Sequence, residues 1–427
     1  MTQSGSTPLN WKAPFITLFA GQALSLFGSA LVQFALVWWL TQTTGSATVL
    51  ALASLAAVLP NVLLSPVAGV LVDRWPRRQV MMVADALVAL ATVALAVLFY
   101  LGAVQIWHVY LALLIRAAAG TFQYPAMSAS TSLMVPKEHL ARVAGFQQTL
   151  RGLMNIAAPP IGALLLGLLP MQGVLAVDVV TAVLAVGTLF FIRIPQPPQT
   201  ARAAQTARPS MWGEMRAGLD YLLGWPGMMA LLLMATVLNF LLSPAGALLP
   251  ILVTKHFGGG VGHLATLEST FGVATVVGGL TLGMWGGFRR RMHTALSGLL
   301  GIGVGFALLG FIPANGFVFA VAAASLAAFM LPITNGPIMA VMQAAVAPEM
   351  QGRVFSLDNA VSTAMAPLGL LIAGPVADAF GVQTWYVVGG VACLLIGVAA
   401  FFIPAIVRLE DGRTLPPAVA AATGGES

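Results

Sequence analysis

The chain has 427 residues, of which 59% are hydrophobic and only 7% are charged, and its mean hydropathy is +0.93. These charges are too few to cover the surface of a water-soluble globule, so the composition excludes a soluble enzyme. A bilayer core about 30 Å thick needs about 20 apolar residues per helix, so the length accommodates roughly a dozen spans. The formal charge of +6 lies mostly in short clusters between apolar runs, which favours membrane topology over a nucleic-acid partner.

Six apolar runs predict six membrane helices in the first half of the chain. Residues 13–72 carry no charge and break at the polar stretch Thr41–Ser46, which predicts two helices joined by a tight turn. The six helices are expected near residues 14–40, 47–72, 79–100, 105–127, 143–168 and 172–192. Prolines and arginines over residues 193–220 then predict a polar linker that re-enters a helix on the membrane surface.

The second half predicts six further helices, and an internal repeat supports the division. The segment Pro136–Val143 precedes the fifth helix, and the similar segment Pro348–Val354 precedes the eleventh. Duplicated halves are typical of transporters. The later helices are expected near residues 226–250, 264–287, 294–312, 317–342, 354–377 and 384–407.

These patterns predict an all-α polytopic membrane protein with twelve transmembrane helices in two pseudo-symmetric six-helix bundles. The expected parts are residues 1–193 for the first bundle, 194–222 for the cytoplasmic linker with its surface helix, 223–410 for the second bundle and 411–427 for a cytoplasmic tail. Lysines and arginines gather in alternate connections, and the opposite side receives only Lys255. Both termini are therefore expected in the cytoplasm. The first apolar run is too long for a cleaved signal peptide.

One connection carries a recognisable pattern between the second and third helices. It places a glycine, an acid and three arginines at a fixed spacing, namely Gly69, Asp73, Arg74, Arg77 and Arg78. The pattern resembles motif A of the major facilitator superfamily, with a proline in place of its second glycine. The resemblance implies a cytoplasmic latch, in which Gly69 allows close helix contact, Asp73 faces the positive end of a neighbouring helix and the arginines pair across the gap. A plain positive-inside loop is the alternative.

Two further motifs lie inside predicted helices. Arg116, followed four residues later by glycine, resembles motif B, a position that the family associates with proton transfer and helix contacts. Gly145, Pro159 and Gly162 resemble the antiporter motif C, although other small or apolar residues replace several of its glycines. An ordinary proline-kinked helix is the alternative there. Arg151 is expected to reach the membrane surface with its long side chain or to pair near that surface.

Polar and acidic residues within the spans supply the remaining candidates. Gln22, Ser25, Ser29 and Gln33 share one face of the first helix, where they line a cavity or pack between helices. Asn239 and Asn335 are weaker cavity candidates. For coupling we select Arg116 with Asp178 or Glu268 as its acidic partner, whereas Asp85 and Asp358 are expected to pair with loop arginines or helix ends. Asp378 is placed at the outer end of the eleventh helix.

The function follows from the resemblance, which extends over the whole chain. Short segments such as Gly21-Gln22 and the turn Thr44–Ser46 resemble exporters of the macrolide-efflux type. The resemblance implies a monomeric transporter of the bacterial cytoplasmic membrane that exports amphipathic drug-like compounds against proton entry by alternating access. No enzyme activity, metal, cofactor or nucleic-acid partner is expected, because no phosphate loop or zinc motif occurs. The alternatives are an exporter of an endogenous metabolite such as a siderophore or a lipid, and a membrane receptor that moves nothing.

Overall fold

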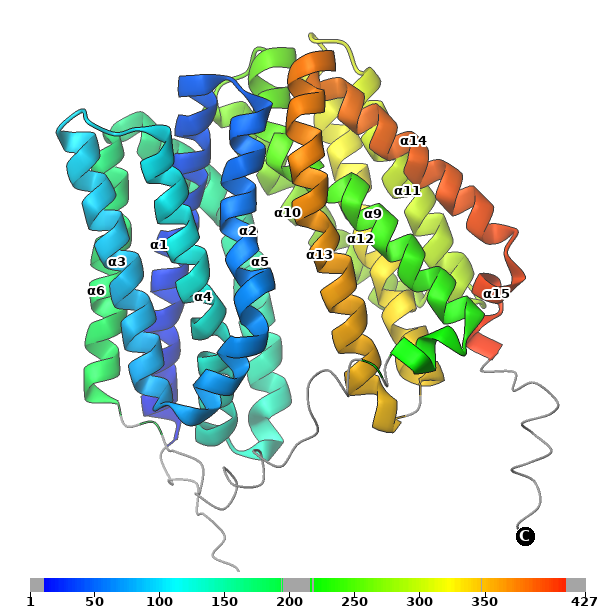
Figure 1. The fold of residues 1–427 in the computed structure, drawn as a ribbon, viewed down its shortest axis with the longest axis horizontal. Coiled ribbons are helices and arrows are strands. Elements are labelled where there is room, and N and C mark those ends of the chain that lie inside the picture. Colours follow the sequence, from blue (N-terminus) through cyan, green and yellow to red (C-terminus); the bar gives the residue numbers. More distant parts are fainter. Residues whose placement is uncertain (1–10, 193, 195–215, 217–218, 347, 412–427) are drawn as a thin grey trace, which may run out of the picture. The chain divides into compact units, whose positions relative to one another are not determined.

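Twelve long helices make up the described part of the chain, which in the computed structural model covers residues 11–192, 194, 216, 219–346 and 348–411 (Figure 1). They are α1 (Lys12–Thr44), α2 (Ala47–Arg74), α3 (Arg77–Tyr100), α4 (Ile106–Met134), α5 (Lys137–Leu168), α6 (Met171–Phe191), α9 (Pro226–Ile251), α10 (Val261–Trp285), α11 (Arg291–Phe311), α12 (Phe317–Ala345), α13 (Pro348–Phe380) and α14 (Val382–Phe401). A π-helical turn, η1 (Leu252–His256), extends α9, and the short elements α15 (Pro404–Val407) and η2 (Leu409–Asp411) follow α14.

Eleven of these helices are long and apolar enough to cross a membrane. The exception is α4, whose sequence includes Arg116 and a run of serines and threonines that lower its hydropathy. It nevertheless packs inside the same bundle, against α2 and α3. Side chains such as Leu90 and Leu395, each 66% exposed, face outward, as lipid contact requires. The chain is therefore a multi-pass helical membrane protein.

Several helices extend beyond the apolar run that predicted them. The fourth ends at Met134 rather than near residue 127, and the fifth begins at Lys137 rather than near 143. The eleventh, α13, begins at Pro348 rather than near 354. These added turns are polar, and a helix can continue into water because its hydrogen bonds are internal. Hydropathy therefore finds the membrane-spanning part of a helix and misses its polar extension.

The turn between α1 and α2 forms as its sequence predicts. Gly45 adopts a left-handed conformation with φ 57°, and its N–H donates to the carbonyl oxygen of Thr41, which ends α1. Ser46 then caps α2, its side chain accepting from the backbone N–H of Val49 at 3.3 Å. Two residues thus reverse the chain between two long helices.

The chain divides into two compact units. The first comprises residues 1–208, 246–272 and 370–382, and the second comprises 209–245, 273–369 and 383–427. In the first, α1 contacts α5 and α6, and α3 contacts α4 and α6. In the second, the buried Tyr386 of α14 donates to the carbonyl oxygen of Ala245 at 2.6 Å. The predicted tail and nearly all of the proline-rich linker lie outside the described residues.

Candidate functional site

An ion pair lies in the interior of the first unit. The guanidinium of Arg116 on α4 contacts the carboxylate of Asp178 on α6 at 2.5 Å. The Asp178 side chain is fully buried and that of Arg116 is 9% exposed. Arg116 lies ten residues into α4, about 15 Å from its beginning. The structure thus brings together the intramembrane arginine and one of its two candidate acids.

Two hydroxyl side chains complete the ion pair. Ser29 of α1 donates to Asp178 Oδ1 at 3.0 Å, and Thr92 of α3 donates to Asp178 Oδ2 at 2.9 Å. Arg116 also donates to the backbone oxygen of Ser29 at 3.2 Å. Buried charges are tolerated when they are paired and their remaining hydrogen-bonding capacity is used. The pair therefore joins α1, α3, α4 and α6 at one point.

A second acid, Asp85 of α3, is buried in the same unit with a different set of partners. It is 2% exposed and accepts from Gln22 at 2.8 Å, from Gln123 at 2.7 Å and from Ser25 at 3.3 Å. These donors come from α1 and α4. The expected pairing of Asp85 with loop arginines or helix ends is therefore wrong, because the helix turns this carboxylate inward toward the amides of its neighbours.

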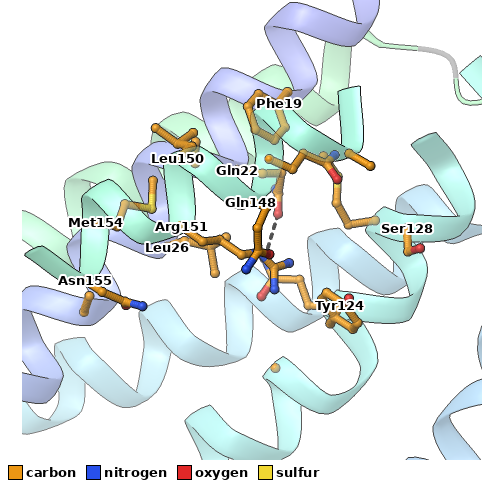
Figure 2. Close-up of a pocket in the computed structure, with 17 residues that line it drawn as sticks. Phe19, Gln22, Leu26, Tyr124, Ser128, Gln148, Leu150, Arg151, Met154 and Asn155 are labelled. Carbon is orange, nitrogen blue, oxygen red and sulfur yellow. Dashed lines mark hydrogen bonds between the residues drawn. The ribbon is translucent and has the colours of Figure 1, made fainter. Parts of the chain in front are cut away.

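A cavity of about 640 Å³ opens beside these networks, between α1, α4 and α5 (Figure 2). Its lining mixes apolar side chains, such as Phe19, Leu26 and Met154, with side-chain amides. The amides belong to Gln22, Gln123, Gln147, Gln148 and Asn155. Ligand pockets are typically about 300–1,000 Å³ and combine an apolar wall with a few polar groups. The cavity therefore has the size and lining to hold a drug-sized amphipathic molecule.

Arg151 is the one charged residue among the 17 that line this cavity. Its guanidinium lies over the ring of Tyr124, 4.7 Å from the centroid, and the two labelled side chains are adjacent in Figure 2. Among the described residues no carboxylate pairs with it. Only the fold shows that α5 turns Arg151 toward α4, and its reach to the membrane surface stays a prediction.

A smaller cavity of about 340 Å³ contains the third coupling candidate. Glu268 of α10 lines it, together with Gln33 of α1 and Asn155 of α5. Asn155 lines both cavities. Neither Arg116 nor Asp178 lines this cavity, so Glu268 lies apart from their ion pair. Within the described residues, no group of three His, Cys, Asp or Glu side chains could hold a metal ion.

Two arginines at the beginning of α3 donate to carbonyl oxygens of neighbouring helices. The buried Arg77 donates to the carbonyl oxygen of Ala129 near the end of α4, at 3.4 Å, and Arg78 donates to that of Phe190 at the end of α6, at 3.1 Å. Cations are stabilising at helix C-termini. Arg74 is exposed, and the side chain of Asp73 lies outside the description. A β-carbon at Gly69 would meet no described atom within 4 Å, so the close helix contact expected there is not seen.

The glycines and the proline on α5 occupy different environments. A β-carbon at Gly162 would lie 2.8 Å from the ring of Phe34, so this glycine allows α5 to approach α1. Pro159 is buried in the wall of the smaller cavity. Gly145 faces open space. Asn239 and Asn335 are exposed, and neither lines the two cavities above.

Sequence reasoning missed several lining residues of α4 and α5. Gln123 and Tyr124 had one available signal, because Arg116, Gly120 and Gln123 follow one another at helical spacing on a single face. Gln147 and Gln148 lie in the first turns of the predicted fifth helix, where polar residues are expected without a cavity. A polar face on a helix that carries an intramembrane arginine would have indicated the cavity.

Comparison with known sequences extends these observations. The model of the family described as Major Facilitator Superfamily matches residues 18–247. Macrolide efflux protein A of Streptococcus pyogenes is 34% identical, over 94% of this chain and 98% of its own. Multidrug efflux pump Tap of Mycolicibacterium fortuitum is 25% identical, over 93% of this chain and 98% of its own.

Solved structures share the fold. A mutant of the peptide transporter POT superposes with a TM-score of 0.70 at 14% identity, covering 92% of this chain and 95% of its own. A mutant of the nucleoside transporter NupG gives 0.69 at 15% identity, covering 90% and 98%. Similarity at this level of identity concerns the arrangement of the helices alone. It agrees with the twelve-helix architecture predicted from the apolar runs.

Proposed function

We propose that this chain, which belongs to the major facilitator superfamily, exports amphipathic macrolide-like compounds from the bacterial cytoplasm in exchange for protons. The observation that carries the proposal is the cavity of about 640 Å³ between α1, α4 and α5, with its apolar and amide lining. A macrolide presents a broad apolar surface together with hydroxyl and carbonyl groups. Such a surface matches Phe19 and Leu26, and its polar groups match the surrounding amides.

The efflux direction is supported by relatives that span nearly the whole chain. Macrolide efflux protein A and multidrug efflux pump Tap are both named for export. Both termini face the cytoplasm in this proposal, because nearly all lysines and arginines between spans then lie on the inner side. The arginines after α2 serve the cytoplasmic gate.

Proton exchange requires acids that can gain and lose a proton within the membrane. Glu268 is available from the smaller cavity, whereas Asp178 is already paired with Arg116. We assign Glu268 to the outer part of the proton route. Arg116 and Asp178 contribute to coupling by fixing the helices that carry the cavity, since neither side chain lines it.

Transport by the purified protein in liposomes tests the proposal. An imposed pH gradient should drive accumulation of radiolabelled erythromycin, and a pH-sensitive dye should report protons moving the opposite way. The Gly120→Leu variant fills the cavity, because Gly120 lines it and has no atom within 4 Å of an added β-carbon. Transport should fall in this variant. The matched control is Gly167→Leu on α5, which has equal space and lies outside the cavity lining.

Three results would contradict the proposal. A folded protein that moves no erythromycin under any gradient would exclude the substrate class. Erythromycin movement without protons would exclude the exchange. Equal loss of transport in both glycine variants would remove the cavity from the mechanism. Saturable binding with no movement would favour the receptor alternative.

The guanidinium of Arg151, which pairs with no carboxylate among the described residues, favours a second candidate function, export of an anionic metabolite such as a siderophore. A carboxylate or catecholate would find its counterion there. The Arg151→Gln variant separates the candidates, since it should abolish transport of an anionic siderophore and leave erythromycin transport in place. The proposal for macrolides is weakened if the wild-type protein prefers the anion.

A further inference from the structure

The negative charges of two buried aspartates in the first unit are stabilised by different kinds of partner. Asp178 has a guanidinium at 2.5 Å, so its negative charge is neutralised locally. Asp85 is almost equally buried, yet the groups that donate to it are two amides and one hydroxyl. Neutral donors stabilise a buried carboxylate without cancelling its charge. Of the two acids, Asp85 is therefore the one whose charge the surrounding protein leaves uncompensated.

Within the described residues, the helices around Asp85 supply no other counterion. Gln22 and Ser25 face it from α1 and Gln123 faces it from α4. The charged groups nearest on α4 and α6 are Arg116 and Asp178, which pair with each other. Among the described side chains of α2, the one charged group is Arg74, at the cytoplasmic end. On α3 itself, Arg77 and Arg78 lie about two turns before Asp85 and donate to carbonyl oxygens of α4 and α6. A proton is thus the available means of neutralising Asp85.

Two of the three donors connect Asp85 to the large cavity. Gln22 Nε2 donates to Asp85 Oδ2 at 2.8 Å, and Gln123 Nε2 donates to Asp85 Oδ1 at 2.7 Å. Gln123 Nε2 also donates to Gln22 Oε1 at 2.7 Å, which closes a ring of three side chains. Both glutamines line the cavity. Within the described residues, no donor reaches Gln123 Oε1.

We propose that Asp85 is a proton-binding residue of the exchange, and that Gln22 and Gln123 link its proton to the occupant of the 640 Å³ cavity. The inference rests on the proposed function, since it names the residue that accepts the counter-transported proton. It also gives a functional role to Asp85, for which the sequence predicts a structural one.

The ring of side chains supplies the link. In the arrangement seen, every partner donates to Asp85, which is the pattern of an ionised carboxylate. A proton on Oδ2 meets Gln22, whose amide must turn over to accept it. The amide nitrogen of Gln22 then faces that of Gln123, so the hydrogen bond between the two glutamines is lost, while Gln123 Nε2 still donates to Oδ1. Each glutamine consequently has one more N–H free for the cavity occupant when Asp85 carries a proton than when it is ionised.

The change in charge and in free N–H groups gives the direction of coupling. A substrate that brings hydroxyl donors or an ammonium group binds better to the ionised form, because it meets a nearby negative charge and fewer unpaired N–H groups. Its arrival therefore breaks the O–H bond of protonated Asp85 and transfers the proton to water in the cavity. The carboxylate keeps the electron pair, and the proton leaves on the side from which the substrate entered. This coupling of substrate binding to proton release is what an antiporter needs.

Proton release on binding provides the test. Purified protein in detergent and weak buffer is mixed with erythromycin, and a pH-indicator dye counts the protons released while fluorescence follows binding. We expect release by the wild-type protein and its loss in Asp85→Asn, with binding retained. The matched control is Asp358→Asn, an aspartate of α13 that lines neither cavity, which should release protons as the wild type does.

The outcomes separate this inference from the proposed function. Release of protons by Asp85→Asn at the wild-type level overturns the inference and leaves proton-coupled export intact. Absence of erythromycin-linked proton release from the wild type overturns both. If Asp85→Asn does not fold, infrared difference spectra of Glu268→Gln decide the question. Erythromycin should then still abolish a protonated-carboxyl band, and absence of that change overturns the inference.

Discussion

Neutralising Asp178 is the change whose energetic cost follows most directly from the structure. Its carboxylate is fully buried and accepts from Arg116, Thr92 and Ser29. In Asp178→Asn the charge disappears and an amide nitrogen replaces one acceptor, so Arg116 stays buried without a counterion. Removing one partner of a buried pair costs about 3–5 kcal/mol. We expect the free energy of unfolding of Asp178→Asn to fall by that amount.

A double-mutant cycle divides the cost between charge and packing. Arg116→Met should be destabilised as strongly as Asp178→Asn, because it leaves the buried carboxylate of Asp178 without a counterion. The combined variant Arg116→Met, Asp178→Leu removes both charges and keeps the volume filled. Replacing a buried pair with apolar residues is often neutral. The double variant should therefore be more stable than either single variant. Thr92→Val, which removes one neutral donor, should cost about 1 kcal/mol.

Unfolding in mixed micelles, followed by tryptophan fluorescence as the fraction of dodecyl sulfate rises, gives these free energies. The slope of the transition checks that every variant unfolds from the same native state. A cost below about 1 kcal/mol for Asp178→Asn would refute the reasoning, because it would mean that water reaches the pair. A double variant as unstable as the sum of the single variants would refute it equally.

Three further predictions concern other described contacts. Gly162→Leu should lower the thermal midpoint of unfolding, because its β-carbon would lie 2.8 Å from the ring of Phe34. Gly145→Leu should leave the midpoint unchanged, because Gly145 faces open space. Equal midpoints in the two variants would contradict this prediction. Asp378 accepts from the backbone N–H groups of Ala47 and Thr48 at 2.8 and 2.9 Å. Asp378→Ala should therefore speed the hydrogen exchange of the backbone amides in the first turn of α2. An unchanged exchange rate would contradict this prediction. Filling the large cavity by Gly120→Leu should raise the KM for erythromycin and leave the thermal midpoint unchanged.

The sequence predicts the membrane helices well, because each span needs a long apolar run and few other structures in lipid can use one. The turn at Gly45 and the boundaries of α3 and α6 follow the sequence within a few residues for the same reason. Intramembrane charge likewise singled out Arg116 and Asp178, since isolated charges in lipid need partners. These features depend on local composition.

The inner arrangement of the site could not be predicted in the same way. Asp85 lies eight residues after the beginning of α3, a depth that suits a loop partner as well as a buried one. Its actual partners, Gln22 and Gln123, are 63 and 38 residues away in the sequence. Which helix each face meets is set by packing between helices, and no local pattern records it. The contact of Arg151 with Tyr124 of α4 could not be predicted for the same reason.

The low hydropathy of α4 has a consequence for how the chain is made. An arginine at the centre of an isolated helix disfavours membrane insertion by about 2.5–3.5 kcal/mol on translocon scales. Its counterion, Asp178, lies 62 residues later, in α6. At about 5–20 residues per second the ribosome needs about 3–12 s to supply it. During that interval α4 must be held beside the translocon or by its neighbours α2 and α3, so a nascent chain arrested before α6 should retain α4 in the bilayer less firmly than a chain that includes α6.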